Sequence, residues 1–185
     1  MNLSEEEKEE LMRIAKESIY CAVRGEEMPI IMVTSERLKE KCGAFVTITK
    51  EGNLRGCIGY SFPIASLYEV VSEVAQSAAL HDPRFPSLTE DELDDIEIEI
   101  SVLSQLENVS DVSEIEVGKH GLLIERRGYK GLLLPQVAID HNWDRIKFLE
   151  QTCYKAGLDK NAWKEKDTII KKFSAEIFGE RKHPK

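Results

Sequence analysis

The chain has 185 residues, which is enough for one domain, or for one domain with a small lobe. A chain of this length can bury a hydrophobic core that needs no disulfides or metal ions to stabilise it. Its hydrophobic fraction of 42% and charged fraction of 32% are typical of a folded soluble protein and exclude a disordered one. The formal net charge of -9 argues against binding to nucleic acid or anionic membrane, and no apolar run is long enough to span a bilayer. The first ten residues are acidic and polar rather than a signal peptide, so we expect a cytoplasmic location.

The cysteines and histidines do not have the spacing of metal ligands. No two cysteines form a C-x-x-C pair, and the four histidines form no H-x-x-x-H pair. Without an export signal, an even number of cysteines is weak support for disulfides. We therefore expect four reduced thiols, no metal site and no cofactor; the cysteines are Cys21, Cys42, Cys57 and Cys153.

The N-terminal part predicts a helix followed by a hairpin. Ser4 and Glu7 have the spacing of a capping box, apolar residues then recur at helical spacing, and Gly25 is a stop signal. Residues 43–49 are rich in strand-forming residues, and residues 54–59 are predicted to form the second strand of a hairpin after a turn. The second strand of this hairpin carries the cysteine motif discussed below.

The middle of the chain predicts a second helix and a half-exposed strand. Pro63 is a typical opening residue, and Ser66 with Glu69 forms another capping signal. The helix has to end before Pro83, because the residue before a proline avoids the helical region. Residues 96–102 then alternate between isoleucine or valine and polar side chains, as in a strand with one buried face.

The C-terminal part predicts a second hairpin, a helix and a last strand. The hairpin strands are 122–125 and 131–134, the helix covers 143–156, and apolar residues alternate over 173–177. Residues 181–185 form a basic tail with nothing to bury. This order of elements predicts an α+β fold, with a mostly antiparallel sheet and packed helices.

The segment 54–60, Leu-Arg-Gly-Cys-Ile-Gly-Tyr, is the strongest candidate for a site. On a strand, Arg55 and Cys57 would emerge on one face roughly 7 Å apart, and a guanidinium near a thiol favours the reactive thiolate. Gly56 and Gly59 leave room for another group to approach the backbone. The alternative for Cys57 is structural, because free cysteine often packs as a small buried hydrophobe.

Five motifs in the same order make the chain resemble the AMMECR domain family. They are Leu-Arg-Gly-Cys-Ile-Gly at 54–59, Asp-Pro-Arg-Phe-Pro at 82–86, Leu-Leu-Leu-Pro-Gln-Val-Ala at 132–138, and the segments 43–47 and 148–153. The resemblance implies a single AMMECR domain over 1–185, with an α+β fold that has a larger and a smaller lobe, in a cytosolic protein. It also implies a possible partner, because prokaryotic members often occur beside a Memo-like domain and a radical-SAM protein. It implies no particular molecular activity.

Two further residues are candidates for ligand binding. Arg84 lies between two prolines, and its planar fork suits an anion, although a structural ion pair is an equally good reading. Gln136 follows the apolar residues 132–135. Its side chain either points into a pocket or forms hydrogen bonds with backbone groups at a strand-to-helix turn. If Arg55 and Arg84 face one cleft, they imply an anionic ligand.

Two functions remain open at this point. In the first, a cleft around 54–60 binds a small anionic molecule in an enzyme or ligand-processing protein, with Cys57 as the catalytic thiol and Arg55, Gly56, Arg84 and Gln136 as ligand-binding residues. In the second, the domain is a non-catalytic module that docks on a Memo-like or radical-SAM partner. Composition and charge do not separate these functions.

Overall fold

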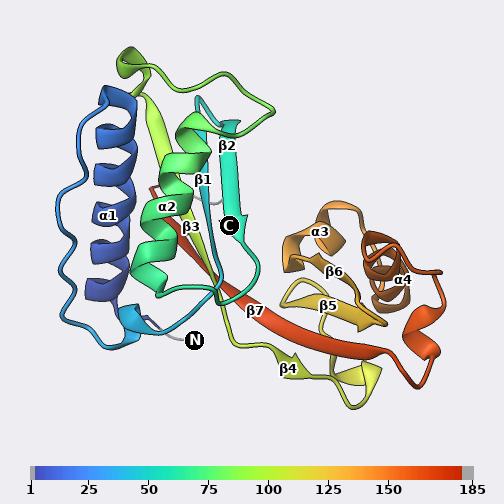
Figure 1. The fold of residues 1–185 in the computed structure, drawn as a ribbon. Helices are drawn as coiled ribbons and strands as arrows, with labels where there is room; N and C mark the ends of the chain where they lie inside the picture. The colour runs from blue at the N-terminus through green and yellow to red at the C-terminus, as the bar shows by residue number, and fades with distance from the viewer. Residues whose placement is uncertain (1–2, 181–185) are drawn as a thin grey trace. The chain divides into compact units, whose positions relative to one another are not determined.

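The computed structural model describes residues 3–180, and the chain divides into two compact units (Figure 1). Of the described residues, 3–103 and 176–180 belong to the larger unit, and 104–175 form the smaller unit. The strands are antiparallel and lie in the order β2 (Asn53–Tyr60), β1 (Ala44–Lys50), β3 (Ile96–Leu103), β7 (Ile169–Gly179), β5 (His120–Arg126) and β6 (Tyr129–Leu133), with the short β4 (Glu107–Asn108) paired to β7. The predicted α+β class is confirmed, and the basic tail 181–185 lies outside the described residues.

Two helices of the larger unit lie over one face of its strands (Figure 1). Helix α1 (Glu5–Arg24) begins with a complete Ser4–Glu7 capping box and ends at Gly25, whose φ of 68° is left-handed. Helix α2 (Leu67–Leu80) begins with a capping box at Ser66, so Pro63 belongs to the connection before the helix rather than to its first turn. Both helices bury an apolar stripe, which fixes their distance from the sheet.

Three strands form the sheet of the larger unit. Strand β1 (Ala44–Lys50) lies between β2 (Asn53–Tyr60) and β3 (Ile96–Leu103). The helix-facing residues of β1 and most of those of β3 are almost fully buried and form the core with α1 and α2, whereas only Gly56 is buried in the edge strand β2. Two short 3-10 turns, Arg37–Lys39 and Glu90–Glu92, complete the unit.

Strand β2 contains an irregularity that the sequence did not reveal. Gly56 is paired with Ile48 and Leu54 with Thr49, so Arg55 is the extra residue of a β-bulge. A bulge interrupts the alternation of side chains and re-aims the residue that forms it. The expectation that Arg55 and Cys57 emerge together from a regular strand therefore does not hold.

The smaller unit packs helices on a second group of strands. Strands β5 (His120–Arg126) and β6 (Tyr129–Leu133) form the predicted hairpin, and helix α4 (Arg145–Lys155) carries the buried residues Phe148 and Cys153. The 3-10 turns Val112–Glu114 and Ala162–Lys164 also belong here.

Three elements of the chain differ from expectation. Helix α3 (Pro135–Asp140) and strand β4 (Glu107–Asn108) were not predicted, because six and two residues are too short to show a period. The last strand, β7 (Ile169–Gly179), is longer than predicted. Its first part pairs with β5, and Glu180, the residue after its end, donates its N–H to the Ile98 carbonyl of β3 at 2.9 Å.

Candidate functional site

The segment 82–86, which follows α2 and is called the connector below, is hydrogen-bonded to the edge of β2 at Cys57. Asp82 accepts a hydrogen bond from the Cys57 backbone N–H at 2.8 Å, and Arg84 Nη2 donates to the Cys57 carbonyl at 3.1 Å. Because β2 is an edge strand, the Cys57 N–H and carbonyl point away from the sheet and have no neighbouring strand to bond. The connector forms hydrogen bonds with both groups instead. We call the residues Thr47, Cys57, Asp82 and Arg84 the Cys57 corner.

Arg84 is held by a nearly fully buried carboxylate. Its Nε and Nη2 atoms bond both oxygens of Asp82 at 3.0 and 2.8 Å, while Asp82 is 2% exposed and Arg84 is 53% exposed. The bond from Arg84 holds the pKa of the Asp82 carboxyl well below its usual range. The pKa of the Arg84 guanidinium is raised, mainly by the hydrogen bond with Asp82 and in smaller part by the Cys57 side chain. The corner therefore presents a fixed, half-exposed positive charge next to a thiol.

The Cys57 sulfur is itself a hydrogen-bond acceptor. Cys57 is half-buried, and the Thr47 hydroxyl on the neighbouring strand donates to its Sγ at 3.3 Å. Thr47 and Cys57 are directly paired across β1 and β2, so the register of the hairpin places this donor. Together with Arg84, this donor gives the thiol polar neighbours rather than a purely apolar packing environment.

Arg55, which we expected beside the thiol, is bound elsewhere. Its Nε and Nη2 atoms donate to Glu92 at 3.1 and 2.9 Å, and its Nη1 donates to the Pro86 carbonyl at 2.8 Å. The side chains of Arg55 and Glu92 are only 14% and 15% exposed. Its place in the bulge turns Arg55 toward this acid, and the guanidinium near Cys57 belongs to Arg84 instead.

The Arg55–Glu92 pair predicts a loss of stability in acid. The guanidinium lowers the pKa of the Glu92 carboxyl from 4.5 to about 2. A carboxyl with a lowered folded-state pKa stabilises the fold above its unfolded pKa, and this contribution is lost as the pH falls through the folded pKa. We expect the free energy of unfolding to fall between about pH 4.5 and pH 2, and to fall less in Glu92→Gln. Urea unfolding at several pH values measures this, with the exposed Asp91→Asn as the control. Identical acid profiles for the wild type and Glu92→Gln would contradict it.

Gly56 faces α2 rather than open space. A Cβ at this position would lie 2.2 Å from the Ala78 carbonyl oxygen, so the strand and helix backbones meet here. Gly59 similarly lies against the Phe45 ring, with a Cβ contact of 2.3 Å. The group that approaches Gly56 is thus part of the fold, and this explains the glycine without a ligand.

Gln136 belongs to the smaller unit and is described by itself. It is the second residue of α3, shortly after the end of β6. Its Oε1 atom is buried and accepts no hydrogen bond from the described part of the chain. Its role in ligand binding stays a prediction.

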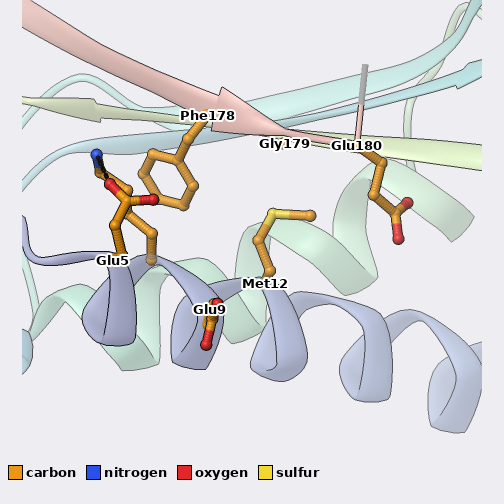
Figure 2. A pocket seen from close by; sticks show the side chains of 7 residues that line it. Glu5, Glu9, Met12, Phe178, Gly179 and Glu180 are labelled. Atoms are coloured by element: carbon orange, nitrogen blue, oxygen red, sulfur yellow. Dashed lines mark hydrogen bonds and ion pairs between the residues drawn. The ribbon is translucent and has the colours of Figure 1, made fainter. Parts of the chain in front are cut away.

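One pocket of the larger unit lies away from the motif. It is formed by α1 and the end of β7 (Figure 2), so a cleft around 54–60 stays a prediction. Within residues 3–180, no three His, Cys, Asp or Glu side chains are grouped as metal ligands. No helix in this range is long and apolar enough to cross a membrane.

Comparison with known proteins identifies the family. The AMMECR1 family model matches residues 12–178, which include all four residues of the Cys57 corner. The chain belongs to the AMMECR1 family. The family resemblance inferred from the motifs is therefore confirmed.

The AMMECR1 relatives come from archaea and bacteria. A protein of Thermococcus onnurineus is 45% identical over 95% of this chain and 90% of its own length. One from Aquifex aeolicus is 38% identical over 93% of this chain and 92% of its own. The crystal structure of the uncharacterized protein PH0010 from Pyrococcus horikoshii matches with a TM-score of 0.79 and 40% identity, over 92% of this chain and 90% of that one. The names of these AMMECR1 proteins state no activity.

Proposed function

We propose that this protein binds a small anionic molecule at the Cys57 corner, with Cys57 as the thiol that contacts or attacks the ligand. The observation that carries the proposal is that Cys57, which has a half-buried thiol, accepts a hydrogen bond at its carbonyl from Arg84, a half-exposed arginine held by the buried Asp82. A buried carboxylate that orients an exposed guanidinium fixes its direction before a ligand arrives, which reduces the entropy lost on binding.

The free donors of the two arginines decide which of them serves a ligand. Arg55 uses its Nε, Nη1 and Nη2 atoms on groups of the protein. Arg84 uses only Nε and Nη2, and its Nη1 donates to none of the described residues. Since a guanidinium carries five N–H donors, Arg84 keeps unused ones for a carboxylate or phosphate oxygen. The proposal therefore retains Arg84 and Cys57 and gives Arg55 and Gly56 structural roles.

The chemistry of the corner suits a ligand with an electrophilic group near its anionic group. Arg84 would bind the anionic group beside Cys57, whose sulfur accepts a hydrogen bond from the Thr47 hydroxyl. A thiolate placed in this way is a nucleophile. The same contacts also suit a ligand that binds without reacting, and the thiol then only lines the site.

A metabolite screen by thermal shift tests the proposal. We expect anionic compounds among the hits, because a ligand that binds the folded state raises the melting temperature by mass action. Arg84→Gln should abolish the shift for these hits, whereas Arg13→Gln should retain it. Arg13 is a suitable control because its 51% exposure matches Arg84 and it pairs with Glu17 on α1. Anionic hits that stabilise Arg84→Gln as strongly as the wild type would contradict the proposal.

A docking function is the second candidate, and exposed apolar side chains beside the motif favour it. Leu54, Phe62 and Ile64 flank the two ends of β2 and are 43%, 39% and 55% exposed. Phe62 and Ile64 lie two residues apart after the end of β2, and exposed apolar side chains that lie together are typical of protein contacts, whereas a single one such as Leu54 is not. A Memo-like or radical-SAM partner would then bind here, and Phe62→Ser with Ile64→Ser would weaken its co-purification while Arg84→Gln would not.

A further inference from the structure

A pocket on the larger unit lies between the start of α1 and the end of β7 (Figure 2). Its volume of about 320 Å³ is at the low end of small-molecule sites, which span about 300–1,000 Å³. This is room for one long side chain or a small organic ion rather than for a folded partner. The lining residues are Glu5, Lys8, Glu9, Met12, Phe178, Gly179 and Glu180.

The pocket has an apolar wall. In Figure 2, the Phe178 ring extends from β7 toward α1, and the Met12 side chain extends from α1 toward Gly179. An aromatic face and a polarisable thioether are favourable surfaces for an alkyl chain, and the aromatic face also attracts a cation. The wall therefore suits the methylene stem of an amphipathic side chain.

The rim of the pocket is negatively charged. Three of the lining residues are glutamates and one is a lysine, which gives 3 − 1, or two, net negative charges. The Lys8 ammonium is already bonded to Glu5 at 2.8 Å and lies 3.3 Å from Glu176. Glu180 is 3.5 Å from Lys16 and also accepts the Ile98 N–H.

Glu9 is the rim carboxylate that remains available to pair with a cation from outside the described residues. It is exposed and has no hydrogen bond or ion pair with the described residues. Adding Glu176 and Lys16 to the four charged lining residues leaves the balance at four acids against two bases, still two net negative charges. The charge of the pocket is thus not neutralised by the surrounding part of the fold.

We infer that this pocket receives the side chain of an arginine or lysine from a basic segment of a partner protein. The methylene stem would pack on Phe178 and Met12, and the cationic head would reach Glu9 at the rim. A long side chain of this kind buries its apolar stem while keeping its charge at the surface. The inference is independent of the Cys57 corner, because the two sites share no residue.

Methyl NMR with short peptides tests this inference. The probe is acetyl-Leu-Arg-Leu-amide, the control is acetyl-Leu-Gln-Leu-amide, and the full-length protein carries ¹³C-methyl methionine. We expect the Met12 methyl signal to shift saturably with the arginine peptide and not with the glutamine peptide, while the distant Met28 signal stays unchanged. No movement of the Met12 signal would overturn the inference.

A matched pair of charge reversals separates the pocket from general electrostatics. Glu9→Lys should raise the Kd at least fivefold, whereas Glu6→Lys should change it less than twofold. Both glutamates are exposed in the first two turns of α1, but only Glu9 lines the pocket. Equal effects of the two variants would overturn the inference.

A last experiment tests whether the basic residues at the C-terminus compete with the peptide for the pocket. The occupant could be the chain's own tail, and a full-length variant with Arg181→Gln, Lys182→Gln and Lys185→Gln removes its charge. We expect this variant to bind the arginine peptide within twofold of the wild type. At least fivefold tighter binding would identify the tail as a competing occupant and overturn the assignment to a partner.

Discussion

Gly56→Ala is expected to destabilise the protein by about 3 kcal/mol, at the upper end of the range for overpacked cores. The added Cβ would lie 2.2 Å from the Ala78 carbonyl oxygen, and a second backbone atom, the Ala78 carbonyl carbon, would be 3.1 Å away. A side chain can rotate out of such a contact, but a helix carbonyl moves only if α2 moves. The substitution therefore forces β2 and α2 apart where both contribute to the core.

Urea unfolding of Gly56→Ala beside Gly52→Ala measures this effect. Gly52 lies in the turn of the same hairpin, with φ of 76° and no atom within 4 Å of an added Cβ. Alanine there costs only the left-handed conformation, about 1 kcal/mol. Equal losses for the two variants would show that the helix does not need the glycine, and Gly56 would return to the list of ligand-binding residues.

Asp82→Ala is expected to cost about 2–3 kcal/mol, the range for losing a hydrogen bond to a charged group together with its buried partner. The carboxylate accepts the Cys57 N–H at 2.8 Å on the outer edge of β2. We assign the cost to this bond and to the Arg84 N–H at 3.1 Å rather than to the ion pair, because Arg84 is half-exposed and its charge is screened by solvent.

A comparison with Asp82→Asn separates the two contributions of the carboxylate. Asparagine retains an acceptor for the Cys57 N–H but does not hold Arg84 by charge. We expect Asp82→Asn to lose about half as much stability as Asp82→Ala, and only Asp82→Ala to self-associate through the uncovered strand edge. Unfolding and size-exclusion measurements decide this. Unchanged stability in Asp82→Ala would contradict the structural role of the connector.

The elements that the sequence predicted well are those with strong local signals. The Ser4 and Ser66 capping boxes mark the starts of α1 and α2, and both form as expected. Alternation over 96–102 predicted β3, and the isoleucines at its even positions are buried or partly buried. The first part of β7, by contrast, reads Ile-Ile-Lys-Lys and lacks alternation, so only its end was predicted.

The contacts around Cys57 could not be predicted in full, because they are between distant segments. The motif at 54–60 drew attention to Cys57, and its two-residue spacing selected Arg55 as the partner. The bulge at Arg55 leaves no signal in the local sequence. Which arginine lies beside Cys57 depends on two ion pairs, Arg55 with Glu92 and Arg84 with Asp82, and the first of these joins segments that are distant in the sequence. The pocket between α1 and β7 was missed for the same reason, since it joins the two ends of the chain.

Alkylation of Cys57 tests the central claim most directly. Iodoacetamide labelling of the native protein, measured by peptide mass spectrometry, compares Cys57 with the buried Cys42 and Cys153. We expect Cys57 to react faster than either, Arg84→Gln to slow its labelling severalfold, and Arg55→Gln to leave the rate nearly unchanged in the folded protein. If Cys57 labels only after denaturation, or at the same rate without Arg84, the corner is a packed structural joint and the docking function becomes the better account.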